Sequence, residues 1–230
     1  MDESPLPWLA RLLQVSDSAF PTGSYAHSHG FEQAVRLGVV HHEASLATYL
    51  ERHLWPVLVH FDLPAIRFAQ QAALGDDLSA LIDLDSTIGA SIAARESREA
   101  SSATGRRRKE ALLATGISTI LAEFGLAIAE RRAHGHHTIV YGIGLAHLPT
   151  SALLTSWAFQ SLSAVCLAAP KLIRIGQNAT QRVLTTSLAD MEAKVTQSLA
   201  ISRDELGWFD PLLEIASMQH EIAHERLFIS

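Results

Sequence analysis

Apolar residues recur at intervals of three and four positions along most of this chain, and this spacing limits the fold more than any other feature. One run consists of Leu46, Tyr49, Leu50, His53, Leu54, Val57 and Leu58. Later runs consist of Leu113, Ile117, Ile120, Leu121, Phe124 and Ile128, and of Val183, Leu184, Leu188, Met191, Val195 and Leu199. Such spacing gathers apolar side chains on one face of a helix. The sequence therefore predicts an all-α fold, with residues 1–230 forming a single compact domain of about eight to ten helices.

Two local features depart from the helical pattern. Pro56 lies inside the first run, where a proline is expected to kink or break a helix. Residues 137–141 have the β-branched and aromatic composition of a strand, although no partner strand is evident.

Composition narrows the class of protein. The chain is 48% hydrophobic and 18% charged, which is typical of a globular protein, and its net charge of −6 argues against nucleic-acid binding. Cys166 is the only cysteine, so an internal disulfide and a cysteine-rich zinc site are excluded. The first residues lack the basic and apolar regions of a signal peptide, so we expect a cytoplasmic location.

One segment is apolar enough to require a membrane test. Residues 133–170 contain no Asp, Glu, Lys or Arg, and residues 151–169 approach the length of a membrane span. Several Ser, Thr and Gln side chains interrupt this stretch, which favours a central buried helix over a membrane helix. Part of its surface is also a candidate for contact with another subunit.

The segment 18–32 forms a break between two helical patterns. Pro21 has a fixed φ angle and Gly23 tolerates backbone angles that other residues avoid. Ser24 is placed to cap a helix that begins near Tyr25. A rigid bend that carries an aromatic ring, two imidazoles and a carboxylate indicates a purpose beyond connecting two helices.

Motifs in this bend and at the end of the chain resemble the urease accessory protein UreF family. The opening motif is Leu12-Leu13-Gln14 followed by Phe20-Pro21-x-Gly23-Ser24-Tyr25-x-x-Ser28-x-Gly30-x-Glu32. The closing motif is Phe209-x-Pro211-Leu212-Leu213-Glu214-Ile215-Ala216-Ser217-Met218-x-His220-Glu221, then Arg226-Leu227-Phe228-x-Ser230. The resemblance covers nearly the whole chain.

The resemblance implies a nickel-insertion chaperone subunit and not an enzyme. UreF-like proteins are all-helical homodimers that join the accessory protein UreD, also called UreH, and the GTPase UreG, and the assembly delivers nickel to apo-urease. No cofactor is then bound stably: the complex handles nickel and UreG binds GTP. The sequence leaves open whether the chain accelerates or restrains GTP hydrolysis.

The expected partner-binding residues lie near both ends of the chain. The resemblance assigns Tyr25 and Arg226 to the surface that faces UreG. In the tail at 221–230, Leu227 and Phe228 are candidate apolar anchors that become ordered on a partner. Glu32, Arg95 and Glu96 are further candidates, although each also fits a structural ion pair.

Three other motifs favour structural roles. The basic run Arg106-Arg107-Arg108-Lys109 is expected to be a solvated helix face. The histidines of 134–137 are potential metal ligands, but a structural or exposed loop is the better interpretation, and no resident metal or catalytic residue is predicted. His220, Glu221 and His224 fit the H-E-x-x-H pattern, which gives a small zinc metallohydrolase as the alternative function; the chain offers no third ligand after them.

Overall fold

The computed structural model describes residues 6–22, 30–116 and 118–221, and every regular element in these ranges is a helix. The first half contains α1 (Leu6–Ser16), α2 (Phe31–Arg36), α3 (Glu43–Tyr49), η2 (Leu50–Leu54), α4 (Trp55–Val57), η3 (Leu58–Asp62), α5 (Leu63–Leu74) and α6 (Leu78–Ser91). The second half contains α7 (Arg95–Thr115), α8 (Thr119–Ala129), α9 (His137–Gly144), α10 (Thr150–Leu172), α11 (Gln177–Leu188), α12 (Met191–Ala200) and α13 (Pro211–Glu221). The all-α prediction is confirmed. Counting 43–74 as one helix, the described residues form eleven helices, slightly more than expected.

The helix over residues 43–74 passes through two prolines without breaking. The π-helical turns η2 and η3 end just before Pro56 and Pro64, and a wider turn accommodates the ring and the missing N–H of proline. One turn before Pro64, the carbonyl of His60 accepts a hydrogen bond from the N–H of Gly207 in the loop after α12, at 3.0 Å. The predicted disruption at Pro56 is thus a local change of helical pitch.

Residues 137–141, which have strand-like composition, begin the helix α9. This short helix packs between α5 and α7, and nearly all of its residues are buried. A Cβ atom on Gly142 would lie 2.6 Å from the carbonyl oxygen of Ile66 in α5, so glycine permits this close approach. Burial on both sides therefore outweighs the intrinsic strand preference of the segment.

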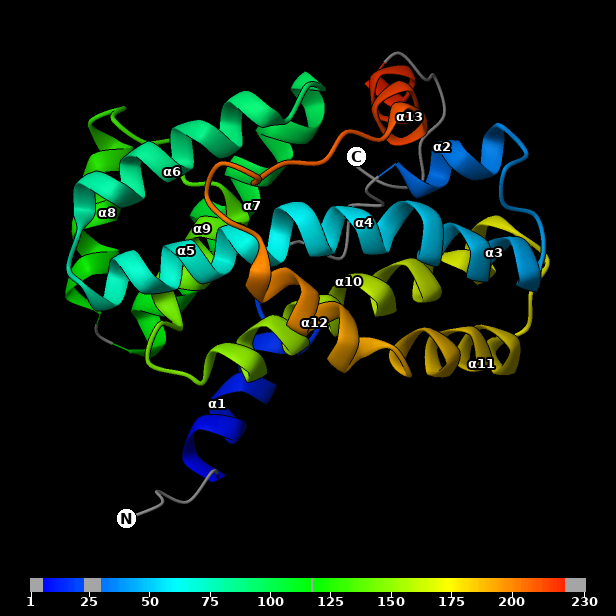
Figure 1. Cartoon of the computed structure of the whole chain (residues 1–230), viewed down its shortest axis with the longest axis horizontal. Helices are drawn as coiled ribbons and strands as arrows, with labels where there is room; N and C mark the ends of the chain where they lie inside the picture. The colour runs from blue at the N-terminus through cyan, green and yellow to red at the C-terminus, as the bar shows by residue number, and fades with distance from the viewer. Residues whose placement is uncertain (1–5, 23–29, 117, 222–230) are drawn as a thin grey trace.

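The uncharged segment forms α10, a central helix that contacts α1, α5, α11 and α12 (Figure 1). Among the described residues, α10 is the one helix long and apolar enough to cross a membrane, and half of its apolar window is buried inside the fold. This burial matches the predicted central helix.

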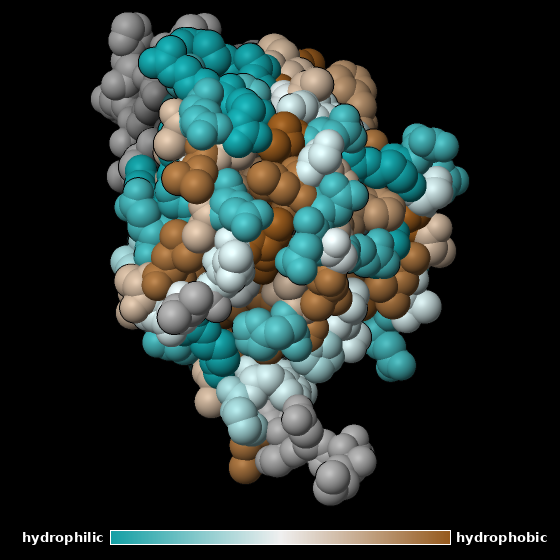
Figure 2. All heavy atoms as spheres, turned by 90° about the vertical axis from the view of Figure 1, so that its left-hand side faces the viewer, coloured by the Kyte–Doolittle hydropathy of each residue, from teal (hydrophilic) through white to brown (hydrophobic). Residues whose placement is uncertain are grey.

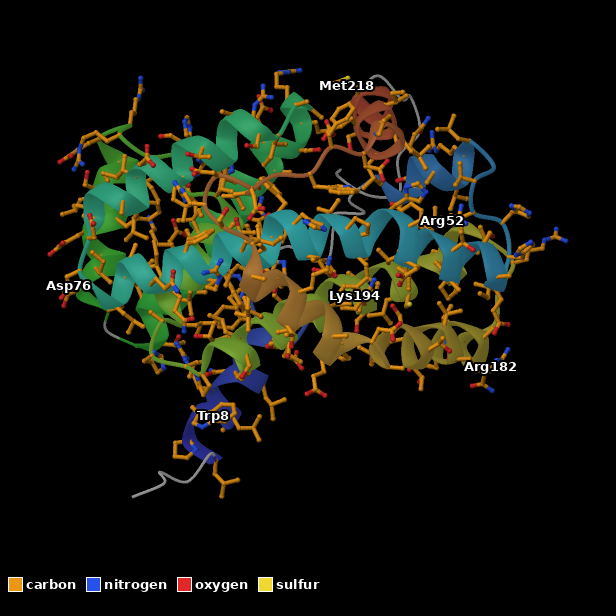
Figure 3. The ribbon with its side chains drawn as sticks, viewed as in Figure 1. Trp8, Arg52, Asp76, Arg182, Lys194 and Met218 are labelled. Atoms are coloured by element: carbon orange, nitrogen blue, oxygen red, sulfur yellow. The ribbon has the colours of Figure 1, made fainter. Side chains whose placement is uncertain are left out.

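Helix α11, which packs against α10, is joined to α3 by an ion pair between Arg182 and Glu43 (2.8 Å) at the edge of the molecule (Figure 3).

The ends of the fold differ in how they are packed. Figure 2, which looks onto the end formed by α6 and α8, shows polar and apolar side chains interspersed on the body. Helix α1 extends away from this body (Figure 1), whereas α13 lies against α2 and α7 on the opposite side.

Candidate functional site

Helix α13 brings together the elements that carry the predicted partner-binding residues. It packs against α2 and against α7 (Figure 1). Gly30, with φ of +79°, precedes α2, and a Cβ atom there would lie 3.4 Å from Oγ of Ser217 in α13. The left-handed backbone at Gly30 therefore allows α2 to begin directly against α13. We call the surface formed by α2, the first turn of α7 and α13 the α13 face.

The start of α13 is fixed by one buried carboxylate. Oδ1 of Asp210 accepts hydrogen bonds from the backbone N–H groups of Leu212 (2.9 Å) and Leu213 (3.2 Å). Oδ2 of Asp210 lies 2.7 Å from Nδ1 of His53 in η2. Asp210 thus caps α13 and ties it to the long helix beneath.

Glu214 marks the junction between α13 and α7. Burial raises the pKa of its carboxyl, the backbone N–H of Ala94 opposes this shift by donating to it, and the nearby charge of Asp210 raises it further. Oε2 of Glu214 is buried and has no hydrogen-bond partner in the described part of the chain. Burial at this junction therefore favours the uncharged form of the Glu214 carboxyl.

The predicted partner-binding residues occupy different environments. Arg95 is exposed and pairs with Glu99 at 3.5 Å, while Glu96 lies half-buried beside it in the first turn of α7. Glu32 is only 1% exposed and pairs with Arg36 at 2.9 Å, which matches the structural alternative that the sequence left open. The remaining candidates lie outside the described residues: Tyr25, Arg226, Leu227 and Phe228.

The basic run is not a simple solvated face, because Arg108 is 2% exposed. Its Nε donates to Nε2 of His137 (2.6 Å) and its Nη1 donates to the carbonyl of Val15 (3.2 Å). The guanidinium also lies over the rings of Phe20 (5.7 Å) and Tyr141 (5.0 Å). Desolvation lowers the pKa of Arg108 to about 10. The solvated-face prediction was therefore wrong for Arg108.

The other two arginines of the run bind neighbouring loops. Arg106 donates to the carbonyl of His134 and Arg107 to that of Thr22, each at 3.3 Å. Together with Arg108, they attach the segment after α1 and the loop before α9 to α7. Sequence reasoning missed this arrangement, because a helical run of arginines does not reveal which members face inward.

The histidine loop before α9 is organised by a carboxylate that is remote in sequence. Asp85 of α6 accepts hydrogen bonds from the backbone N–H groups of His134 (2.5 Å), Gly135 (3.1 Å) and His136 (2.8 Å). Burial lowers the pKa of His136. The described residues contain no group of three or more His, Cys, Asp or Glu side chains that could hold a metal ion. In the described part of the chain, the histidine loop is held in place by Asp85 and has a structural role.

The H-E-x-x-H segment lies at and beyond the end of α13. His224 and the side chains of His220 and Glu221 lie outside the described residues.

A family model for UreF matches residues 40–188, which span the helices from α3 to α11. The chain belongs to the UreF family. It is 34% identical over 221 residues to the urease accessory protein UreF of Arthrobacter sp. (strain FB24), covering 95% of this chain and 96% of that protein. It is 32% identical to the UreF of Bacillus sp. (strain TB-90), covering 96% and 99% of the two chains.

The family assignment includes the α13 face. The UreF relatives align over nearly their full length, so the similarity reaches past residues 40–188 toward both ends of the chain. The chain is therefore a urease accessory protein of the UreF type, and the resemblance inferred from its end motifs is confirmed.

Proposed function

We propose that this UreF-family chain is a non-enzymatic subunit of a cytoplasmic nickel-insertion complex. In this role it acts as a homodimer, joins UreD (UreH) and the GTPase UreG, and helps to deliver nickel to apo-urease. The full-length similarity to urease accessory proteins carries the proposal. Nickel and GTP belong to the assembly and to UreG, and this chain holds no stable cofactor.

The α13 face is the surface on which we place the partners. In the first turn of α7, Arg95 is exposed and Glu96 is half-buried. Helix α13 is followed in the chain by the segment that contains Arg226, Leu227 and Phe228. The outer surface of α13 exposes Ile215 (51%) and Met218 (48%; Figure 3), which are apolar groups suited to a protein partner. Tyr25, in the segment before Gly30, is assigned to the same surface, and Glu32 supports it from within α2.

Co-expression with UreD and UreG tests the proposal. We expect the three proteins to elute together from a sizing column. With UreD present, Arg226→Ala should reduce UreG recovery at least about fivefold, because arginine is enriched among the interface residues whose loss costs more than about 1 kcal/mol. Arg95→Ala should have a smaller effect, since its charge is exposed and paired with Glu99.

Arg174→Ala is the matched control. Arg174 is exposed between α10 and α11 and does not belong to the α13 face, so UreG recovery should remain unchanged. Full recovery of UreG with Arg226→Ala would contradict the prediction that Arg226 in the tail binds UreG. Failure of the unmodified chain to form any complex with UreD and UreG would remove the proposed function itself.

A further inference from the structure

Residues 201–210, which we call the strap, connect α12 to α13 along the outside of the long helix over residues 43–74. In Figure 1 the strap leaves α12, crosses the long helix near the start of α5, and ends at α13. Three residues of the long helix contact it: His53, His60 and Arg67. They are seven residues apart, about two helical turns, so they line one side of that helix.

The two ends of the strap are fixed by polar contacts. At its start, Nη2 of Arg67 donates to the carbonyl of Ile201 at 2.5 Å. At its end, Oδ2 of Asp210 lies 2.7 Å from Nδ1 of His53. The strap therefore runs antiparallel to the long helix.

The middle of the strap is attached to a single residue, His60. Gly207 has a φ of +152°, a backbone conformation that other residues rarely adopt, and its N–H donates to the carbonyl of His60 at 3.0 Å. The indole of Trp208 then stacks on the imidazole of His60, with ring centroids 5.1 Å apart and an interplanar angle of 21°. The backbone and the side chain of His60 thus both contact the strap.

The strap is held by these few contacts and buries little surface. Asp210 is the one buried residue among its ten, and the aromatic side chains of Trp208 and Phe209 are 44% and 69% exposed. Segments with little buried apolar surface open locally at a lower free energy than the core does. The stack on His60 therefore matters more for the strap than an equal contact would within the core.

We propose that the strap holds α13 in the position that the partners bind, with His60 and Trp208 as positioning residues. The inference rests on the proposed function, in which the α13 face docks the partners. Asp210, the last residue of the strap, caps the first turn of α13. When the strap opens at His60, the start of α13 is attached to the long helix through Asp210 alone. Partner affinity then falls with the fraction of molecules whose strap is open.

Amide hydrogen exchange of the full chain without partners is the first test. His60→Ala and Trp208→Ala each remove the ring stack and keep the backbone bond between residues 60 and 207. Each should accelerate exchange in residues 214–221 about 2- to 10-fold, the range expected for the loss of one aromatic contact. The melting temperature should change by less than about 2 °C, because the strap opens without unfolding the core. His60→Phe, which retains a ring to stack on Trp208, should restore slow exchange.

Recovery of UreG in co-expression with UreD is the second test. Gly207→Pro excludes a φ of +152° and removes the N–H that binds His60, so it should open the strap and lower UreG recovery at least about fivefold. Gly176→Pro is the matched control, because Gly176 precedes α11, outside the strap, and its φ of −79° suits proline. This control should recover UreG as the unmodified chain does.

Unchanged exchange of α13 in both His60→Ala and Trp208→Ala would overturn the inference. Full recovery of UreG by Gly207→Pro would also overturn it. The exchange experiment contains no partner, so it decides whether the strap holds α13 even if the unmodified chain forms no complex with UreD and UreG. Only that last result removes the proposed function.

Discussion

Asp62 shows how a single partly buried carboxyl group makes the stability of this fold depend on pH. It ends η3, lies half-buried, and accepts a hydrogen bond from the indole N–H of Trp157 at 3.0 Å. Burial raises the pKa of the carboxyl to about 6, and the Trp157 hydrogen bond opposes that shift only partly. Because the folded-state pKa is above that of the unfolded chain, the folded protein favours the protonated form.

We predict that Asp62→Asn stabilises the protein at neutral pH. In the unmodified chain, the protonated Asp62 carboxyl adds to the free energy of unfolding below about pH 4, and this stabilisation is lost as the pH rises through about 6. The amide stays neutral and still accepts from Trp157, so the variant should gain about 1–3 kcal/mol in unfolding free energy at pH 7.5 and little at pH 4. Urea unfolding at both pH values measures this difference.

Asp204→Asn is the control for Asp62→Asn, because Asp204 is exposed in the loop after α12. Its unfolding free energy should change by less than about 0.5 kcal/mol at either pH. An Asp62→Asn variant with the same pH dependence as the unmodified chain would show that Asp62 is ionised in the fold without penalty.

At the scale of elements, the sequence predicts helices well where the apolar spacing is long and regular. It does not predict α9, since the strand-like composition of 137–141 is outweighed by burial between α5 and α7. It also does not reveal Arg108 as a buried residue or Asp85 as the organiser of the histidine loop. Both roles depend on contacts between elements that are remote in sequence.

For the candidate site, the sequence predicts the family and the candidate residues, but not how deeply each residue is buried. The end motifs identify the correct family, and helix α13 places α2 next to the start of α7, so Glu32, Arg95 and Glu96 belong to connected elements. The burial of Glu32 depends on packing around α2, which helical spacing alone does not specify. Roles for Tyr25, Arg226, Leu227 and Phe228 remain predictions.

Helix α13 should depend on its single cap more than the other helices do. We predict that Asp210→Ala increases amide hydrogen exchange in residues 214–221 about 5- to 30-fold, because loss of an N-cap costs about 1–2 kcal/mol. The same variant also removes the partner of His53. His53→Ala, which keeps the cap, should give a smaller increase over the same residues.

Asp77→Ala provides the matched control for α13. Asp77 caps α6 through its bond to the N–H of Ala80 (2.9 Å), so its loss should accelerate exchange in α6 and leave α13 unchanged. Unaltered exchange of α13 in Asp210→Ala would mean that contacts with α2 and α7 are sufficient to hold the helix.

At the scale of the whole molecule, the fold separates two kinds of surface. The α13 face combines charged residues of the first turn of α7 with exposed apolar side chains of α13, whereas the exposed side of α10 has no charged side chain before Lys171. The core between these surfaces is continuous through α5, α9 and α10. The two surfaces therefore lie on different sides of one continuous core.

This arrangement predicts that thermal stability depends on protein concentration. If folding is coupled to formation of the proposed homodimer, each tenfold rise in concentration adds about 1.4 kcal/mol per dimer to the free energy of unfolding. Given the unfolding entropy of two chains of this length, the melting temperature should rise by about 1–2 °C per tenfold. Phe159→Glu places a charge on the exposed uncharged side of α10 and should melt at a temperature independent of concentration. Leu126→Glu, at an exposed position on α8, should retain the dependence. Calorimetry over a hundredfold concentration range measures all three proteins, and a constant melting temperature for the unmodified chain would show that its stability does not depend on a second copy.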